Sequence, residues 1–135
     1  PVQWDDTPNA GFTTAETPWM DVNENFHEIN VAQQLADPDS ILNFYKKAIA
    51  LRKELKAVRY GAYKDHFPLH AHIWCYTRET KCEKLLVLCS FSGKPQNLRI
   101  PAGYDLDKGE LILHNYEDRL PKILQPYECR VYLWK

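Results

Sequence analysis

The chain has 135 residues, of which 44% are hydrophobic and 26% charged, a balance typical of globular proteins. The formal net charge is −1 and the Lys and Arg residues form no long cluster. This argues against nucleic acid and against an anionic membrane surface as partners. No apolar run approaches the length of a membrane-spanning helix. The sequence begins with Pro1 and not with Met, so we expect it to be a portion of a longer protein.

Residues 1–27 have the composition of a loop, with several Pro, Asn, Asp and Thr residues. They nevertheless include four large aromatic residues, Trp4, Phe12, Trp19 and Phe26. Disordered tails are poor in such residues. We therefore expect an ordered loop that packs on other structure or lines a cavity, and long ordered loops of this kind are often functional.

Two helices are predicted after this loop. Residues 30–36 form a short helix with Asn30 as its N-terminal cap. A longer helix over Asp39–Lys56 has apolar residues at helical spacing, which gives it a broad apolar face. We expect Asp37 to cap this helix and Pro38 to occupy its first position.

The sequence from Val58 onward predicts short β-strands. The apolar run Leu85–Leu88 has no polar side, so it predicts a central strand that is covered on both faces. Strands at this spacing are typical of an antiparallel sandwich or barrel. The predicted strands are Arg59–Lys64, His72–Arg78, Lys84–Ser90, Gln96–Ile100, Glu110–His114 and Glu128–Trp134.

The spacing of the four cysteines matches no zinc motif of the Cys-x-x-Cys type. Three of them lie in apolar strand-like runs. We therefore expect reduced thiols that act as small hydrophobic residues, and we favour this over a disulfide or a metal site. Reduced thiols also suit a cytoplasmic protein. The four are Cys75, Cys82, Cys89 and Cys129.

The residues taken alone point to no reaction. Three histidines, His66, His70 and His72, lie near Asp65, but a loop that contains Pro68 gives no fixed convergence of ligands. Asp5 and Asp6 are adjacent, whereas the two carboxylates of a glycosidase must face each other across about 5–9 Å. The residues therefore indicate an α+β protein with a β-rich C-terminal part.

The opening segment Pro1–Thr13 resembles glycoside hydrolase family 13 near the end of its catalytic barrel. It is most similar to the branch of oligo-1,6-glucosidases, dextran glucosidases and related α-glucosidases, in which the segment usually reads Pro-Met-Gln-Trp-Asp. Val2 is a mild departure from that pattern. The resemblance continues at Pro18–Trp19, Val22–Asn23, Glu28–Val31, Asp39–Ile41, Ala50–Lys53, Tyr60–Gly61, Glu83–Val87, His114–Tyr116 and Pro126–Glu128.

This resemblance implies a fold class for the chain, an α+β fragment made of two parts. Residues 1–56 would be the active-site-face loop and the last helix of a (β/α)₈ barrel. Residues 57–135 would be a C-terminal antiparallel β-sandwich domain. The barrel of the same parent chain would then be the partner that covers the broad apolar face of the long helix.

The resemblance also implies that the parent is a retaining α-glucosidase that hydrolyses α-1,6-linked gluco-oligosaccharides without a cofactor or metal ion, and that it is cytoplasmic. The catalytic carboxylates of the family lie on earlier barrel strands, so residues 1–135 are expected to contain none and to be inert alone. Gln3, Trp4 and Asp5 are the substrate-binding candidates of the parent. We favour Trp4 packing beneath the loop over Trp4 contacting the sugar.

Other functions stay open. A carbohydrate-binding β-sandwich module would need Trp74, Tyr76, Tyr132 and Trp134 on one sheet face as a stacking platform, although we favour a role for them against the missing barrel. A second alternative is a relative that isomerises sucrose or makes trehalose. A third is a non-enzymatic relative, the heavy chain of an amino-acid transporter, against which the Gln3–Asp5 motif and the cysteines argue.

Overall fold

The computed structural model describes residues 1–135 and divides them into two compact units, Pro1–Ala50 and Leu51–Lys135. The chain is of the α+β class, with a main helix and antiparallel sheets. The division falls before the boundary expected after residue 56, because Leu51 and Leu55 pack in an apolar cluster of the second unit. None of the helices is both long and apolar enough to cross a membrane.

The first unit contains two short 3₁₀ helices, Pro8–Gly11 and Glu24–His27, and helix α1, Val31–Ala36. It also contains most of helix α2, Ile41–Glu54, which crosses the boundary between the units. The cap predicted for α1 is confirmed, since the Asn30 side chain accepts a hydrogen bond of 2.9 Å from the backbone N–H of Gln33.

The predicted start of α2 is wrong. The helix begins at Ile41, and Ser40 acts as its cap because the Ser40 hydroxyl accepts a hydrogen bond of 3.2 Å from the N–H of Asn43. Asp37 instead accepts the N–H of Asp39 at 2.9 Å, in the turn that precedes the helix. Pro38 therefore lies in that turn and not in the helix.

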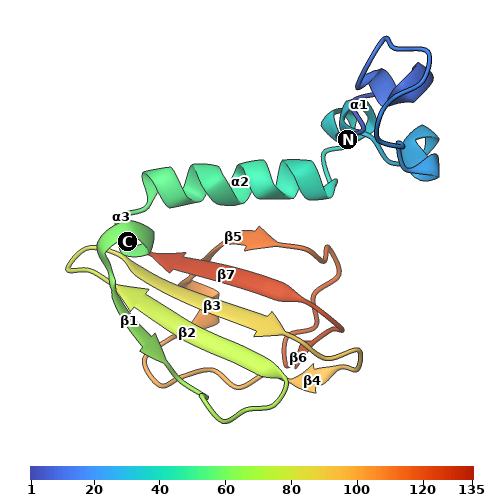
Figure 1. The fold of residues 1–135 in the computed structure, drawn as a ribbon. Coiled ribbons are helices and arrows are strands. Elements are labelled where there is room, and N and C mark those ends of the chain that lie inside the picture. Colours follow the sequence, from blue (N-terminus) through green and yellow to red (C-terminus); the bar gives the residue numbers. More distant parts are fainter. The chain divides into compact units, whose positions relative to one another are not determined.

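The second unit is built on a five-stranded antiparallel sheet in the order β1-β2-β3-β7-β5 (Figure 1). Strands β4 and β6 form a separate two-stranded sheet, and a 3₁₀ turn, Leu106–Lys108, precedes β5. The elements are α3 (Lys56–Tyr60), β1 (Ala62–Asp65), β2 (Ile73–Glu79), β3 (Lys84–Ser90), β4 (Gln96–Asn97), β5 (Glu110–His114), β6 (Ile123–Leu124) and β7 (Cys129–Trp134).

Helix α3 occupies part of the segment predicted as a strand at Arg59–Lys64, so that prediction is wrong in its first half. Two side chains from distant turns and strands fix the helix. The Glu83 carboxylate accepts the N–H of Ala57 at 2.8 Å, near the helix start. Arg78 donates to the carbonyls of Ala57 and Gly61, each at 3.0 Å, near its end.

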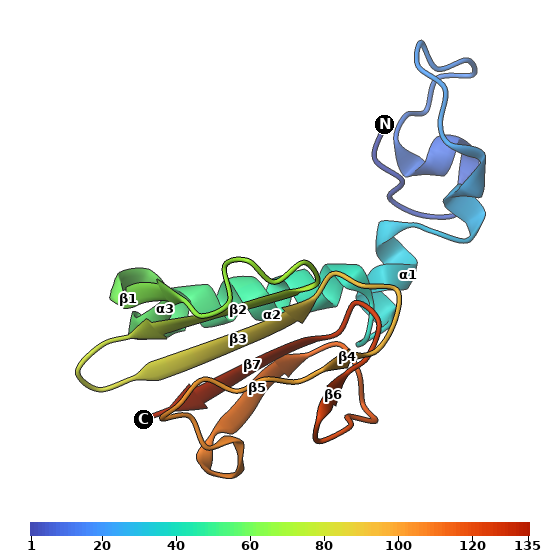
Figure 2. The same cartoon turned by 90° about the horizontal axis from the view of Figure 1, so that it is seen from below.

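Strand β3 is central and covered on both faces, which confirms the prediction from its apolar sequence. Leu85 and Val87 pack in a cluster with Leu55 of the connection before α3. Leu86 and Leu88 face the opposite side, in a cluster that also contains Leu124 of β6. Figure 2 shows α3 and β6 on opposite sides of the sheet.

The four aromatic residues proposed as a stacking platform do not share a face. Tyr76, with Trp74 two positions away on the same strand, faces the cluster around Val87. Tyr132 and Trp134 belong to the cluster on the other face. The pair on β2 and the pair on β7 therefore lie on opposite faces of the sheet. The hypothesis of a single stacking platform is wrong.

A buried ion pair connects β7 to the segment that leads into it. Glu128 is 0% exposed and Arg130 is 2% exposed. The Arg130 guanidinium donates to the Glu128 carboxylate at 2.6 and 3.0 Å and to the carbonyls of Leu120 and Ile123 at 3.0 and 2.8 Å. The same carboxylate accepts the N–H of Gln125 at 2.7 Å. Each charge therefore has its partners inside the protein.

Replacing Glu128 with Ala should destabilise the protein strongly, because it leaves the Arg130 guanidinium buried without its counter-charge. We expect the free energy of unfolding to fall by about 3–5 kcal/mol, measured by denaturant unfolding. The control is Lys108→Ala, which removes an exposed ion pair with Asp105 and should change stability by less than about 1 kcal/mol. Equal losses in the two variants would contradict this role of the buried pair.

Candidate functional site

The segment Gln3–Asp5 is held against the start of helix α1. The carbonyls of Gln3 and Trp4 accept hydrogen bonds of 2.9 Å from the N–H groups of Val31 and Ala32. These N–H groups lie in the first helical turn, where no partner exists within the helix. The segment therefore completes the hydrogen bonding of α1 and takes its position from it.

The Gln3 side chain adds a second anchor. Its amide donates to the Asn25 side chain at 2.9 Å and to the Ile29 carbonyl at 2.7 Å. Asn25 belongs to the 3₁₀ helix Glu24–His27, and Ile29 lies in the loop between that helix and α1. Gln3 thus fixes the opening segment to the chain that leads into α1, and both its donor bonds are used within the protein.

Asp5 closes a tight turn. Its carboxylate accepts the N–H of Thr7 at 2.9 Å and the Thr7 hydroxyl at 2.5 Å. Both hydrogen bonds hold the pKa of Asp5 below its usual value, and the bond from the hydroxyl has the larger effect. Gly11 lies against the same carboxylate at a φ of +63°, and a Cβ there would be 2.7 Å from Asp5 Oδ1. Glycine is therefore required on both steric and conformational grounds.

Trp4 is 51% exposed, so the expectation that it packs beneath the loop is wrong for this structure. Its backbone N–H donates to the Ala10 carbonyl at 2.9 Å, which fixes the position of the residue while leaving much of the indole in solvent. Among Gln3, Trp4 and Asp5, Trp4 offers the largest free surface. An exposed aromatic face of this kind can pack on the apolar face of a sugar ring.

Asp5 and Asp6 do not form a facing pair of carboxylates. Asp5 is bonded to Thr7, whereas Asp6 forms an exposed ion pair with His27. Sequence reasoning missed the Asp6–His27 pair, because the two residues are far apart in the chain and His27 belongs to no motif. The arrangement offers no acid and base aimed at a common point.

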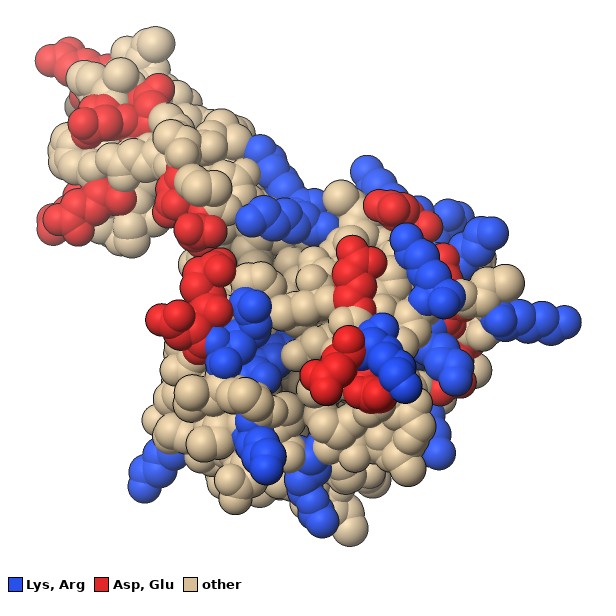
Figure 3. Space-filling model, turned by 180° about the vertical axis from the view of Figure 1, so that it is seen from behind, with Lys and Arg blue, Asp and Glu red and all other residues tan.

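The charges are divided unevenly between the units. Residues 1–50 contain eight Asp and Glu and two Lys, a net charge of −6, whereas residues 51–135 contain fifteen Lys and Arg and ten Asp and Glu, a net charge of +5. Figure 3 shows acidic side chains over the first unit and basic ones mainly over the second. The first basic residue is Lys46, so the region of Gln3–Asp5 supplies no Lys or Arg to an anionic ligand.

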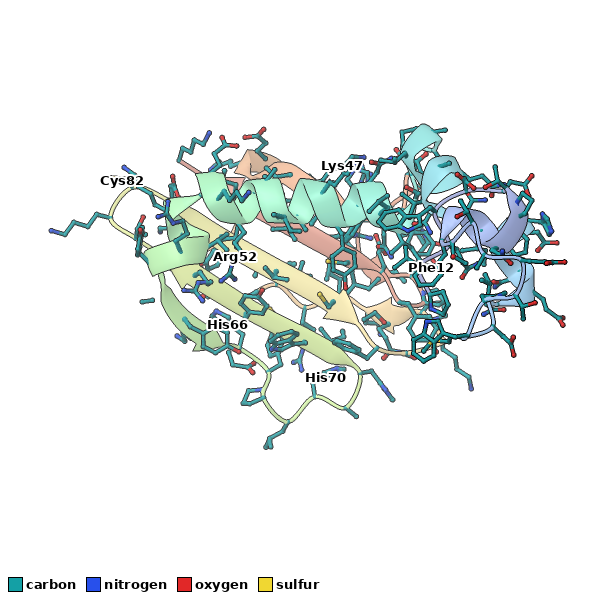
Figure 4. All side chains as sticks on the ribbon, turned by 45° about the horizontal axis from the view of Figure 1, so that its top comes forward. Phe12, Lys47, Arg52, His66, His70 and Cys82 are labelled. Carbon is teal, nitrogen blue, oxygen red and sulfur yellow. The ribbon has the colours of Figure 1, made fainter.

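The histidines near Asp65 have separate structural roles, and Figure 4 shows His66 and His70 at different places in the fold. His66 Nε2 lies 3.0 Å from the Thr77 hydroxyl, and burial lowers its pKa. His70 Nδ1 accepts the N–H groups of His72 and Ile73 in the turn before β2. No group of three or more His, Cys, Asp or Glu side chains in the chain could hold a metal ion.

Comparisons with known proteins point to one group of enzymes. A family model described as the catalytic domain of alpha amylase matches residues 1–61. The chain is 43% identical over 137 residues to the oligo-1,6-glucosidase of Parageobacillus thermoglucosidasius, covering 98% of this chain and 24% of that protein.

Solved structures agree with the sequence comparison. The trehalose-6-phosphate hydrolase of Bacillus licheniformis superposes with a TM-score of 0.89 at 36% identity, covering 98% of this chain and 25% of that one. The trehalulose synthase of Pseudomonas mesoacidophila superposes with a TM-score of 0.86 at 35% identity, covering 98% and 24%. The chain spans about a quarter of the length of the relatives it matches.

Replacing Thr7 with Val should raise the pKa of Asp5, because it removes the hydroxyl that stabilises the carboxylate most. The backbone bond from residue 7 remains, so the pKa should rise only part of the way to the ordinary value. Carboxyl ¹³C NMR during a pH titration measures this. The control is Thr13→Val, which loses a hydroxyl that accepts from Ala15 and has no bond to Asp5. An unchanged Asp5 pKa in Thr7→Val would contradict the assignment.

Proposed function

Because the chain belongs to glycoside hydrolase family 13, in the branch of oligo-1,6-glucosidases and α-glucosidases, we propose that it is the C-terminal part of a retaining α-glucosidase acting on α-1,6-linked gluco-oligosaccharides. The observation that carries the proposal is the match along nearly the whole chain, at 43% identity to an oligo-1,6-glucosidase and with a TM-score of 0.89 to a solved relative. The sequence comparison supports the substrate class, and the fold comparison supports the family.

In this proposal the reaction of the parent enzyme needs two carboxylates. One attacks the anomeric carbon and forms a glycosyl-enzyme, while the other protonates the leaving oxygen and then activates water. Asp5 and Asp6 are unsuited to these roles, since they have different partners and no common target. The catalytic pair therefore belongs to other parts of the parent, and residues 1–135 alone are inert.

Residues 1–56 take the role of the last helix of a (β/α)₈ barrel and the loop on its active-site face. The exposed apolar side chains of α2 support this, since Ile41 is 72%, Tyr45 64% and Ile49 48% exposed. Covering such side chains is worth about 1.5–3 kcal/mol each. The barrel of the same parent chain is the partner that would cover them, and residues 57–135 are its C-terminal β-sandwich domain.

Within that arrangement, Gln3, Trp4 and Asp5 lie at the edge of the sugar pocket. Gln3 and Asp5 use their polar atoms to shape the loop, and the exposed Trp4 ring is the group free to contact a sugar. The lack of Lys and Arg before Lys46 favours a neutral oligosaccharide over a sugar phosphate as the ligand of this segment. The trehalulose synthase among the structural relatives keeps a sucrose-isomerising parent as the second candidate.

A chimera tests the proposal. In the oligo-1,6-glucosidase of Parageobacillus thermoglucosidasius, the region matched by this chain is replaced with residues 1–135. We expect the chimera to fold and to release glucose from isomaltose, because the grafted segment supplies the same helix, loop and β domain. The same enzyme without the region should be inactive, and residues 1–135 alone should hydrolyse neither isomaltose nor a chromogenic α-glucoside.

Two results would overturn the proposal. A chimera that folds, as judged by circular dichroism and gel filtration, but hydrolyses no α-glucoside would show that this chain does not replace the enzyme's own C-terminal part. Turnover by the purified 135-residue chain that survives further purification would show that it has catalytic groups of its own.

A further inference from the structure

Two cysteines that take no part in the proposed function face each other across neighbouring strands. Cys89 of β3 and Cys129 of β7 are partners in the strand register, although 40 positions separate them in the sequence. Their Sγ atoms are 3.5 Å apart. The other two thiols are elsewhere, since Cys75 is buried in the cluster on the opposite sheet face and Cys82 is exposed in the β2–β3 turn (Figure 4).

The backbone around the pair has the geometry that a disulfide between strands requires. The hydrogen bond between β3 and the chain entering β7 lies one position away from the cysteines. There the N–H of Ser90 donates to the Glu128 carbonyl at 2.8 Å. The N–H of Cys129 points the other way and donates to the Asn115 side chain at 2.7 Å. Cys89 and Cys129 are thus a non-hydrogen-bonded pair, for which Cα atoms lie about 4.5 Å apart. That distance falls within the range of about 4.4–6.8 Å found in disulfides.

The chemistry of the two thiols differs in a way that suits stepwise oxidation. The hydrogen bond with Cys129 lowers the pKa of Cys89, against the opposing effect of burial. The same bond, together with burial, raises the pKa of Cys129. Both residues are half-buried. Burial, followed by the negative charges of Asp65 and Cys89, raises the pKa of Cys75 to about 12. Cys89 is therefore the thiol of the pair that ionises first, with its resolving partner already in contact.

We propose that Cys89 and Cys129 form an oxidisable dithiol site, which small-molecule disulfides convert to a cross-strand disulfide between β3 and β7. The Cys89 thiolate attacks one sulfur of the small disulfide, forms a mixed disulfide and releases the first small thiolate. Cys129 then loses its proton and attacks Cys89 Sγ, which breaks the mixed disulfide and releases the second small thiolate. Two protein thiols are oxidised, the small disulfide is reduced to two thiols, and the two protein protons pass to the released thiolates.

The product would close a loop of the chain between two neighbouring strands of the core sheet. Such a bond restricts the unfolded chain, so oxidation should raise the melting temperature and reduction should restore the original value. The structure contains four free cysteines, and the expectation from the sequence that they are reduced stays a prediction. The proposed site adds a second, oxidised state that the spacing of the cysteines did not indicate.

The test is oxidation of the folded, purified protein with oxidised glutathione, followed by alkylation in denaturant and mass spectrometry. Cys89 and Cys129 should both lose their free thiols, and together they should lose two hydrogens without gaining glutathione. Trypsin should then release Leu85–Arg99 linked to Ile123–Arg130, because the bond after Lys94 is blocked by Pro95. Dithiothreitol should separate the two peptides.

Matched variants identify the pair. In Cys129→Ser, Cys89 should stop at the mixed disulfide with glutathione, whereas Cys75→Ser and Cys82→Ser should leave the linked peptides unchanged. If Cys129→Ser does not fold, the peptide map of the unaltered protein identifies the linked cysteines without it. Three results would overturn the proposal. The first is a link that joins any other pair of cysteines, and the second is a link that forms only in denaturant. The third is a Cys89–Cys129 pair that stays unreacted after Cys82 has taken up glutathione.

Discussion

The apolar strand β3 imposes the main constraint on this protein, because a strand with large apolar side chains on both faces must be covered twice. One cover comes from Leu55 and Ala57 around the start of α3, and the other includes Leu124 of β6. Polar groups hold each cover in place. Arg78 fixes α3 on one side, and Arg130 binds the chain around β6 on the other. The order of the strands and the positions of the connecting segments follow from this double coverage.

The first unit is stabilised in a different way. Its fully buried side chains are few and small or polar, such as Ala10 and Asn30, and both apolar clusters lie in the second unit. Hydrogen bonds between loops give it shape, above all those from the start of α1 to Gln3 and Trp4. Net stabilisation per hydrogen bond is only about 0.5–1.5 kcal/mol. The unit also exposes several aromatic residues. We therefore expect its stability to depend on apolar contacts with further parts of the protein.

The sequence predicted features that depend on local chemistry. The double burial of β3 and the Asn30 cap were readable because hydrophobic pattern and capping residues are properties of a short stretch. Helix α3 was missed because Glu83 and Arg78, which fix its ends, lie far along the chain. At the candidate site, Gln3–Asp5 was located by resemblance alone. Its partners come from separate loops, so no spacing in the sequence could have identified them.

Hydrogen exchange of backbone amides tests whether residues 51–135 contain a complete core that the first unit lacks. We expect the slowest exchange in β2, β3 and β7, intermediate exchange in Asn43–Arg52, and the fastest exchange in residues 1–27. If residues 1–27 exchange as slowly as β3, the first unit has a stable core of its own. That result would contradict the proposal that these residues belong to the end of a barrel.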